Sequence, residues 1–314
     1  MGDMIVTVTP NPAMDVFLHL DELHCGYINR VRRLVQQPGG KGVNVGLALH
    51  DLGSPVVATG FLGGNTGRHL EELLRDTGIT SSFVYVDDDT RTNHIIIDAR
   101  YGGQTQVIEP GPRVTDADIA RLTERISRLL GECSFLVVAG SLPDGMAPSA
   151  CASLGSLAKA RDVRTVLYLH DSDLADAMGD GVYMARPDIR DRSTFMGFEV
   201  TEREGRAGLA KRLLERAQIA VVGTGFEALV ADREGAWSVT GPACSVSGGT
   251  VRMDDFFLAG MLDRLAHGGS LREAAQEGMA CVLAALSNAP APRARKEDLA
   301  AHAERVEVLE VGRL

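Results

Sequence analysis

The residues best suited to chemistry include a lysine inside a glycine cluster, Gly39-Gly40-Lys41-Gly42-Val43-Asn44. Glycines in front of a helix leave backbone N–H groups open to an anion, and the helix dipole favours negative charge there. Lys41 would add a positive point charge for a phosphate group. The run is not a P-loop, because Gly42 stands where that motif has serine or threonine. A tight turn with a solvated lysine is the alternative interpretation.

A second candidate is Asp255, which follows a glycine turn and lies in the first turn of a predicted helix. A carboxylate at this place could accept the proton of a hydroxyl that attacks a phosphoryl group. The alternative is a purely structural role, because an aspartate near a helix N-terminus stabilises the N–H groups that have no partner in the helix.

Two more polar residues lie where ligand binding is plausible from position alone. Arg91 begins a predicted hairpin, from which its guanidinium could reach a phosphate, although an ordinary surface arginine fits equally well. Ser141 directly follows a predicted strand over residues 135–138. Loops at the carboxyl ends of parallel strands are where open α/β sheets bind ligands, although a simple turn serine fits the same position.

Other patterns argue against several kinds of site. The glycines at 60, 63, 64 and 67 do not match a dinucleotide-binding fingerprint, and close packing of a strand against a helix explains them better. The eight histidines show no metal-ligand spacing, and His170 is interpreted as an ordinary surface or core residue. No Gly-x-Ser-x-Gly motif supports a serine nucleophile.

Apolar runs alternate with amphipathic stretches over most of the chain, which predicts a parallel sheet covered by helices on both faces. The predicted strands cover residues 4–9, 56–60, 135–138, 163–169, 182–185, 219–222 and 228–231. The predicted helices cover residues 43–52, 66–77, 116–130, 149–160, 202–218, 255–266, 271–286 and 297–303. Residues 15–20 with 29–36, and 93–100 with 104–108, alternate like half-exposed antiparallel strands and predict a small accessory sheet.

The composition limits the class of protein. The 314 residues are 45% hydrophobic and 24% charged, which is ordinary for a globular chain. The net charge is −10 and there is no basic run, which argues against nucleic acid or an anionic membrane surface as a partner. Widely spaced cysteines and the lack of a signal-peptide pattern predict a cytoplasmic protein with reduced thiols. No apolar run is long enough to predict a transmembrane helix.

Six stretches together resemble the PfkB (ribokinase-like) family of sugar kinases, most of all its branch of 1-phosphofructokinases and tagatose-6-phosphate kinases. They cover residues 7–15, 39–44, 90–93, 109–112, 140–143 and 255–260, in the family's order. The resemblance implies a three-layer α/β ribokinase-like fold with a mostly parallel central sheet, as a single domain over residues 1–314. A small antiparallel lid would come from residues about 15–36 and 90–108, and this lid could mediate a homodimer.

The resemblance also implies transfer of a phosphoryl group from ATP, with Mg²⁺, to a hydroxyl of a sugar phosphate or a similarly shaped cyclitol phosphate. Lys41 and Arg91 would hold the phosphate that the substrate already carries. Asp255 would take the proton from the attacking hydroxyl. The sugar itself would be bound by Asn11, Asp15, Gly39, Gly40, Asn44, Asn93 and Ser141.

The motifs on the nucleotide side depart from the family pattern. Gly-Ala-Gly before the catalytic aspartate is replaced by Arg252-Met253-Asp254, which places a negative charge near an anion site. Arg252 could compensate as a catalytic residue, with its guanidinium on the γ-phosphate. The family's Lys-Pro-Asn-x-x-Glu becomes Arg186-Pro187-Asp188-Ile189-Arg190-Asp191, in which Asp188 and Asp191 could bind Mg²⁺ through oxygen. The predicted nucleotide contacts are Arg186, Gly223, Thr224, Gly225 and Asn288.

These departures leave two functions open. The first is an active but slow sugar-phosphate kinase, because the acceptor motifs and Asp255 are present. The second is a phosphosugar-binding pseudokinase with a sensor or interaction role, because three nucleotide-side motifs are altered while the sugar-phosphate motifs are intact. The third altered motif is the nucleotide loop, where Val222-Gly223-Thr224 stands in place of the family's Ser-x-Gly.

Overall fold

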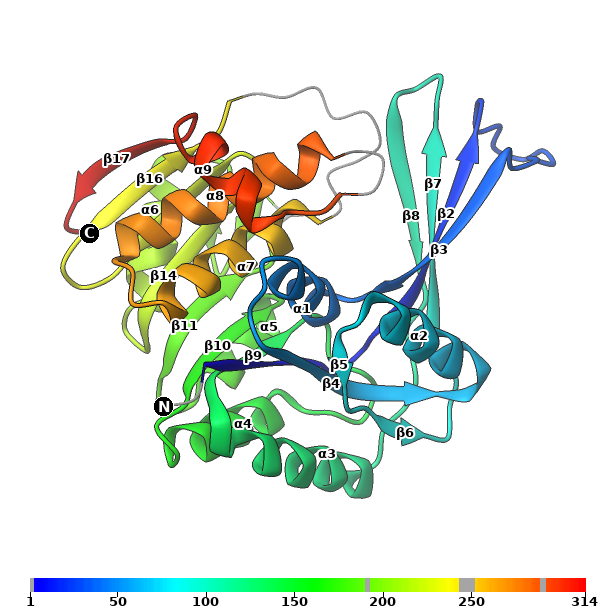
Figure 1. Ribbon diagram of the computed structural model, residues 1–314, viewed down its shortest axis with the longest axis horizontal. Coiled ribbons are helices and arrows are strands. Elements are labelled where there is room, and N and C mark those ends of the chain that lie inside the picture. Colours follow the sequence, from blue (N-terminus) through cyan, green and yellow to red (C-terminus); the bar gives the residue numbers. More distant parts are fainter. Residues whose placement is uncertain (1–2, 190–192, 243–251, 289–291) are drawn as a thin grey trace.

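The computed structural model describes residues 3–189, 193–242, 252–288 and 292–314, and within them a central sheet of eleven strands forms the middle layer (Figure 1). Its spatial order is β17 (Glu307–Gly312), β16 (Ala236–Thr240), β15 (Glu227–Ala231), β14 (Ala217–Thr224), β11 (Val182–Pro187), β10 (Arg164–Leu169), β9 (Cys133–Ala139), β1 (Met4–Thr9), β4 (Val56–Gly63) and β5 (Thr80–Ser81). β6 (Val84–Val86) also pairs with β4. Strand pairs from β14 across to β5 are parallel, and those from β14 to β17 are antiparallel. The mostly parallel sheet that the sequence predicts is confirmed.

Helices cover both faces of this sheet, which makes three layers (Figure 1). Because side chains alternate along a strand, Ile5 and its neighbour Val6 belong to different hydrophobic clusters on opposite faces. Helices α1 (Lys41–Asp51), α2 (Gly64–Thr77), α7 (Met253–Ala266), α8 (Leu271–Ser287) and α9 (Lys296–Ala303) pack on the side of Ile5. Helices α3 (Asp116–Leu129), α4 (Pro148–Lys159), α5 (Asp171–Ala177) and α6 (Arg203–Leu213) pack on the side of Val6.

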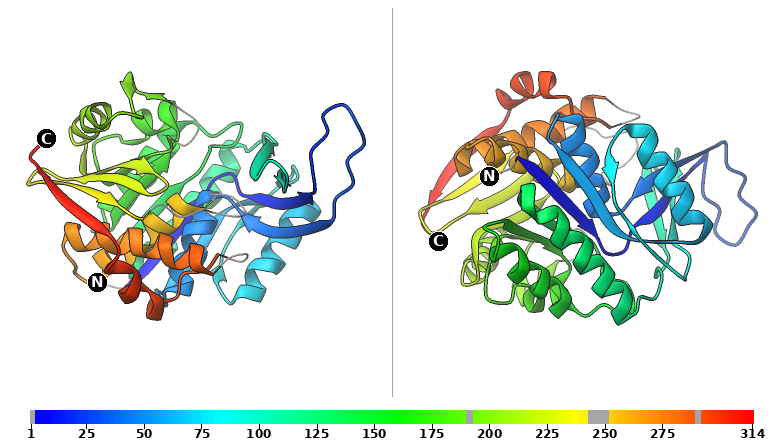
Figure 2. Two further views of the ribbon diagram at one scale, coloured as in Figure 1. Left: turned by 90° about the horizontal axis from the view of Figure 1, so that it is seen from above. Right: turned by 60° about the horizontal axis from the view of Figure 1, so that its bottom comes forward.

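A four-stranded sheet, here called the lid, projects from this body (Figure 1 and Figure 2). Its order is β3 (Arg33–Gly39), β2 (Ala13–Leu20), β7 (Arg91–Asp98) and β8 (Gly103–Ile108). The two outer pairs are antiparallel, as expected. The central pair, β2 with β7, is parallel. These two strands belong to separate segments that leave the central sheet, one after β1 and one after β6. The predicted accessory sheet is therefore present.

The structure differs from the sequence-based expectation at several elements. The prediction of one helix over residues 202–218 is wrong, because α6 ends at Leu213 and the apolar run from Ala217 pairs with β11 instead. The sequence patterns indicate neither α5, β16 nor β17. β17 is an edge strand without a fully buried residue, so it lacks the apolar run that marks the interior strands. The other elements outside the prediction are short, namely β5, β6, a 3-10 turn (Leu130–Glu132) and the hairpin of β12 (Thr194–Phe195) and β13 (Phe198–Glu199).

The cysteines of the described residues differ sharply in burial, which gives a test of the fold. Cys25 is exposed in the segment between β2 and β3, whereas Cys133, Cys151 and Cys281 are buried. Burial raises the pKa of the Cys133 thiol to about 11 and that of Cys151 to about 12, and it also raises the pKa of Cys281. Alkylation requires the thiolate, so in the native protein near pH 8 we expect Cys25 to react at least about 100-fold faster than these three.

Peptide mapping by mass spectrometry after timed exposure to iodoacetamide measures these rates. Protein unfolded in urea serves as the control, because all thiols should then react at similar rates. The rate at the buried cysteines should rise as the pH rises toward their pKa values. Equal rates in the native protein would contradict the packing described here.

Candidate active site

A pocket of about 550 Å³ lies where the carboxyl ends of the central strands face the lid. Its walls come from the loops after β1, β9, β10 and β11, from the first turns of α1 and α7, and from the lid. It is lined by Asn11, Asp15, Gly40, Lys41, Asn44, Arg91, Asn93, Ile95, Gln106, Ile108, Glu109, Pro110, Gly140, Ser141, Leu142, His170, Asp188 and Asp255. Every residue that the sequence suggests for substrate binding lines this pocket except Gly39, which lies directly behind it.

Two glycines allow α1 to start next to the lid. A Cβ atom on Gly39 would overlap the carboxyl group of Asp15, so this place in β3 has no room for a side chain. Gly40 precedes α1 with a φ of 103°, a conformation that glycine adopts without steric cost. The helix therefore begins immediately after β3, and its first turn brings Lys41 and Asn44 to the pocket.

Three asparagines line the pocket with their amide groups in a defined orientation. The Nδ2 of Asn44 donates to Asp255 Oδ2 at 2.8 Å, and that of Asn93 donates to Asp15 Oδ1 at 2.9 Å. The Nδ2 of Asn11 donates to the Pro110 carbonyl at 3.0 Å. Because carboxylates and carbonyls only accept hydrogen bonds, the amide oxygens must point the other way. All three oxygens are buried and have no hydrogen-bond partner among the described residues.

Two cations flank these amides. Lys41 Nζ lies 2.8 Å from Asp188 Oδ2. Arg91 donates to the backbone oxygens of Asn11 at 3.0 Å and Glu109 at 3.2 Å, so its hydrogen bonds go to neutral groups. Burial lowers the pKa of the Arg91 guanidinium, and the carboxylates of Asp15 and Glu109 oppose that shift. An arginine remains protonated under these conditions, so Arg91 brings a positive charge to the pocket.

Asp255 is the acidic residue at the base of the pocket. It lies in the first turn of α7 and is only 2% exposed. Its Oδ2 accepts the hydrogen bond from Asn44, which fixes the carboxylate relative to α1. The N-cap residue of α7 is Arg252, whose side chain makes no capping hydrogen bond. A carboxylate held in this way can orient a hydroxyl and accept its proton.

The altered residues next to Asp255 do not reach the pocket. Arg252 Nη2 donates to the Pro38 carbonyl at 2.9 Å and lies 3.8 Å from Asp15 Oδ2. Arg186, predicted as a nucleotide contact, is buried and lies 2.7 Å from Asp254 Oδ1. The two predicted contacts thus face protein groups, and the negative charge of Asp254 has a cation beside it.

The remaining predicted nucleotide contacts lie apart from the pocket, whereas one of the two predicted metal ligands lines it. Gly223, Thr224 and Gly225 form the end of β14 and the turn into β15, and Gly225 lies beside the Met253 side chain. Asn288 follows α8 and donates to the carbonyls of Ala284 and Arg293. Asp188 lines the pocket, whereas Asp191 lies outside the described residues. Among the residues described, no group of three His, Cys, Asp or Glu side chains suits a metal ion.

Three polar residues that line the pocket are absent from the candidates that the sequence suggests. His170 is one of them, and its Nε2 lies 3.7 Å from Asp188 Oδ2. Like Ser141, it follows a predicted strand, so the same signal marks it. Gln106 belongs to β8, where no local pattern marks it, and Glu109 follows β8 in the stretch 109–112 that carries the family resemblance.

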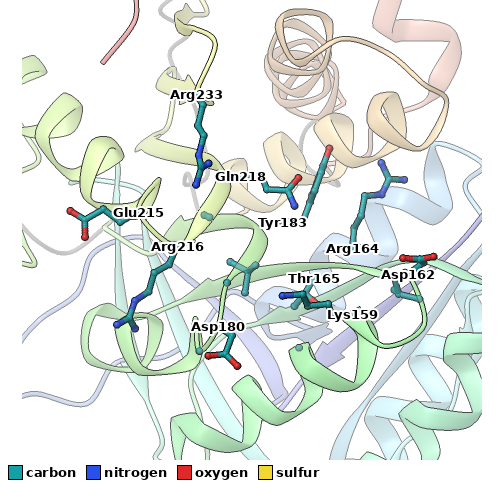
Figure 3. A pocket seen from close by; sticks show the side chains of 16 residues that line it. Lys159, Asp162, Arg164, Thr165, Asp180, Tyr183, Glu215, Arg216, Gln218 and Arg233 are labelled. Atoms are coloured by element: carbon teal, nitrogen blue, oxygen red, sulfur yellow. The ribbon is translucent and has the colours of Figure 1, made fainter.

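A second cavity of about 590 Å³ opens at the opposite, amino-terminal edge of the central sheet (Figure 3). Its charges are mixed, and Glu215 and Arg216 point away from Lys159. The cations along its walls are Lys159, Arg164, Arg216 and Arg233, and the acids are Asp162, Asp180 and Glu215. None of the predicted site residues lines it, so we place no chemical step there.

Comparison with known proteins agrees with this geometry. A model of the pfkB family carbohydrate kinases matches residues 12–289. Tagatose-6-phosphate kinase from Staphylococcus epidermidis is 30% identical over 228 residues, covering 71% of this chain and 73% of that protein. 1-Phosphofructokinase from Haloferax volcanii is 34% identical over 281 residues, covering 88% of each chain. The crystal structure of a possible 1-phosphofructokinase from Thermotoga maritima has a TM-score of 0.90 at 32% identity and covers 98% of this chain and 99% of that one.

The names of these relatives are those of kinases, and nothing in the comparisons supports the alternative of a pseudokinase. No helix in the part of the chain that the structure describes has the length and apolar character needed to cross a membrane. The family match covers most of the sequence, and the same fold occurs in the similar crystal structure. The predicted resemblance and ribokinase-like fold are thereby confirmed, and the chain belongs to the pfkB family of carbohydrate kinases.

Proposed function

We propose that this chain is a cytoplasmic enzyme that uses ATP and Mg²⁺ to phosphorylate a hydroxyl of a sugar phosphate. The observation that carries the proposal is the content of the 550 Å³ pocket, which is lined by the cations Lys41 and Arg91, three asparagines and the Asp255 carboxylate. The names of the relatives from Staphylococcus epidermidis and Haloferax volcanii favour a phosphorylated ketose. A cyclitol phosphate of similar shape is the second substrate class.

The amide oxygens explain selection of a polyhydroxylated ligand. A buried acceptor without a hydrogen bond costs about 1–3 kcal/mol, and a sugar hydroxyl that donates to it removes that cost. Asn11, Asn44 and Asn93 line the pocket, and each has such an oxygen. A sugar whose hydroxyl groups reach these oxygens would gain the hydrogen bonds, and a deoxy analogue would leave an acceptor without a partner.

The phosphate of the substrate would lie between Lys41 and Arg91. Charge-assisted hydrogen bonds to phosphate are stronger than neutral ones. Arg91 bonds only to neutral oxygens, so its charge is available to an anion. Lys41 would share its ammonium group between the phosphate and Asp188. The two cations would thus fix one end of the sugar and leave the acceptor hydroxyl at Asp255.

Asp255 would act as the general base. Asn44 holds one carboxylate oxygen, so the group has one preferred orientation toward the acceptor hydroxyl. The hydroxyl proton would pass to Asp255 as the oxygen attacks. Positioned proton transfer of this kind contributes about 10²–10⁴-fold to a rate. Positioning and charge stabilisation supply most of the remainder in phosphoryl transfer.

The residues around the start of α7 fit a nucleotide. An uncapped helix N-terminus presents N–H groups to an anion, and the turn with Thr224 and Gly225 lies beside Met253 at that helix start. Thr224 and Gly225 would hold the nucleotide, and Asp188 with Asp191 would hold the metal through oxygen ligands, which Mg²⁺ prefers. When bound, ATP supplies the phosphoryl group and Mg²⁺ neutralises its charge.

The first prediction concerns recognition of the phosphate. Lys41→Ala should weaken binding of fructose phosphate by about 10–100-fold, because it removes a charge-assisted contact and leaves Asp188 facing the anion. Binding of free fructose should change by less than about threefold on the same grounds. Isothermal titration calorimetry measures both affinities, with Lys211→Ala on the exposed surface of α6 as the control. Equal affinity of the wild-type protein for phosphorylated and free sugars would refute the assignment of Lys41 and Arg91.

The second prediction concerns the general base. Asp255→Asn should lower kcat by about 10²–10⁴-fold while sugar-phosphate affinity remains, because the amide can still accept the bond from Asn44 but cannot take a proton. Asp116→Asn, in the first turn of α3, is a matched control for an effect on helix stability alone. Single-turnover transfer from ATP measures the chemical step. Wild-type turnover in the Asp255→Asn protein would rule out the mechanism, and a wild-type protein that binds sugar phosphate without transfer would favour the pseudokinase.

The third prediction concerns the lid as a homodimer interface. Large apolar side chains are exposed there, with Tyr27 81% and Ile28 83% exposed between β2 and β3. Leu34 of β3 and Tyr101 beside β8 add to this surface. Exposed apolar patches of this kind are typical of protein interfaces. Light scattering should give the mass of two chains for the wild-type protein and of one chain for the double variant Tyr27→Asp/Ile28→Asp.

Leu309→Asp provides the matched control for the dimer. Leu309 is 55% exposed on β17, at the far edge of the central sheet, so its change to aspartate should leave the mass of the assembly unaltered. A strictly monomeric wild-type protein at micromolar concentration would remove the lid interface from the proposal and leave the kinase activity unaffected.

A further inference from the structure

Arg186 and Asp254 form a buried ion pair next to the catalytic centre. Arg186 Nη2 lies 2.7 Å from Asp254 Oδ1, and the two side chains are 2% and 6% exposed. The guanidinium carbon lies 5.2 Å from the ring centroid of Tyr168 and 5.3 Å from that of Phe257, so aromatic rings from β10 and α7 enclose it. Charges this deeply buried are tolerated only as a pair, because the removal of either leaves an uncompensated charge in the interior.

Arg186 acts on α7 rather than on the substrate pocket. It belongs to β11 and lies on the same strand face as Met184, which packs in the cluster beneath α1, α7 and α8. It does not line the 550 Å³ pocket. Its ion pair with Asp254 joins β11 to the first turn of α7, one residue before Asp255.

The first turn of α7 is thereby held at two points by two different elements. Asp254 is joined to β11 through Arg186, and Asp255 is joined to α1 through Asn44 at 2.8 Å. No side-chain cap holds this turn. The Arg186 contact therefore contributes, with that of Asn44, to the position of the Asp255 carboxylate.

The ion pair also sets the net charge at the N-terminus of α7. Asp254 alone would place a second carboxylate beside Asp255 and oppose an anion that approaches the N–H groups of the turn. The guanidinium beside it offsets that charge. Arg252 does not supply this compensation, because its guanidinium bonds to the Pro38 carbonyl and faces Asp15.

We propose that Arg186 and Asp254 are positioning residues for phosphoryl transfer, which act as one unit through the first turn of α7. The pair keeps the Asp255 carboxylate in place against the acceptor hydroxyl and keeps the helix start receptive to the transferring phosphoryl group. This inference rests on the proposed kinase function. It assigns to Arg186 a role through Asp254, in place of the direct nucleotide contact that the sequence suggested.

The test compares Asp254→Asn, Arg186→Met and the double variant under saturating ATP–Mg²⁺ with fructose phosphate varied. Asp254→Asn should lower kcat by about 10²-fold, as a small displacement of a reacting group does, and should leave the KM for the sugar phosphate within about threefold. The double variant should lose about as much as one single variant, because residues that act as a unit are not additive. Arg186→Lys retains a cation and should keep a higher kcat than Arg186→Met.

Asp263→Asn is the matched control. Asp263 lies on the same helix, is 2% exposed, and accepts a hydrogen bond from Ser54, but it is more than two turns from Asp255. Its change should lower the melting temperature as Asp254→Asn does and leave kcat near that of the wild-type protein. A purely structural role for Asp254 would give both variants the same loss of kcat.

Three results would overturn the inference. They are a wild-type kcat in Asp254→Asn, a loss no greater than that in Asp263→Asn, and losses that multiply in the double variant. If the Arg186→Met protein does not fold, kcat of the Asp254→Asn and Arg186→Lys proteins still tests the first two of these results. A wild-type protein without any transfer would instead contradict the proposed function, and the inference with it, whereas an active wild-type protein with variants outside the expected pattern would contradict the inference alone.

Discussion

The parallel pairing of β1, β9, β10 and β11 is the constraint on which the site depends. Parallel neighbours end at the same edge of a sheet, so the residues that follow them meet regardless of their separation in sequence. Asn11 follows β1, Ser141 follows β9, His170 follows β10 and Asp188 follows β11, and all four line the pocket. Aligned registers keep the strand ends level. The sheet therefore gathers polar side chains from four loops before any helix contributes.

The helices add what strand ends alone lack, namely charges whose cost of burial is offset by a partner. Lys41 and Asp255 come from the first turns of α1 and α7, and each faces a group that stabilises its charge, Asp188 for the lysine and Asn44 for the carboxylate. A buried charge without a partner costs several kcal/mol, on the order of the whole stability of a domain. The buried groups without a partner at Asn11, Asn44 and Asn93 are neutral amide oxygens, and unpartnered carboxylates would be far more costly to bury.

The sequence predicts those features that one element determines by itself. The strand predicted over residues 4–9 matches β1 at both ends, because a buried parallel strand is a continuous apolar run. Glycines mark the helix start near Lys41, and an acidic first turn marks the helix start near Asp255. Local sequence patterns do not predict a feature that depends on contacts with a neighbouring element. β17 is stabilised by its pairing with β16, and His170 approaches Asp188 only because β10 and β11 are adjacent in the sheet. Motifs in the sequence predict most residues of the candidate site, whereas the hydrogen bonds between them can be known only from the fold.

The nucleotide-side motifs interact with one another in the fold, which is not apparent when each motif is considered by itself. Arg186 and Asp254 are 68 residues apart, and in the sequence each is an independent departure from the family pattern. In the fold they lie 2.7 Å from one another and are buried together. The family pattern already has a cation, a lysine, where Arg186 stands, whereas the buried charge of Asp254 departs from that pattern and is offset by Arg186. Two of the altered motifs therefore meet in one ion pair next to Asp255. The number of altered motifs thus overstates the loss on the nucleotide side, and it gives no physical reason to favour a protein that binds sugar phosphates without phosphorylating them.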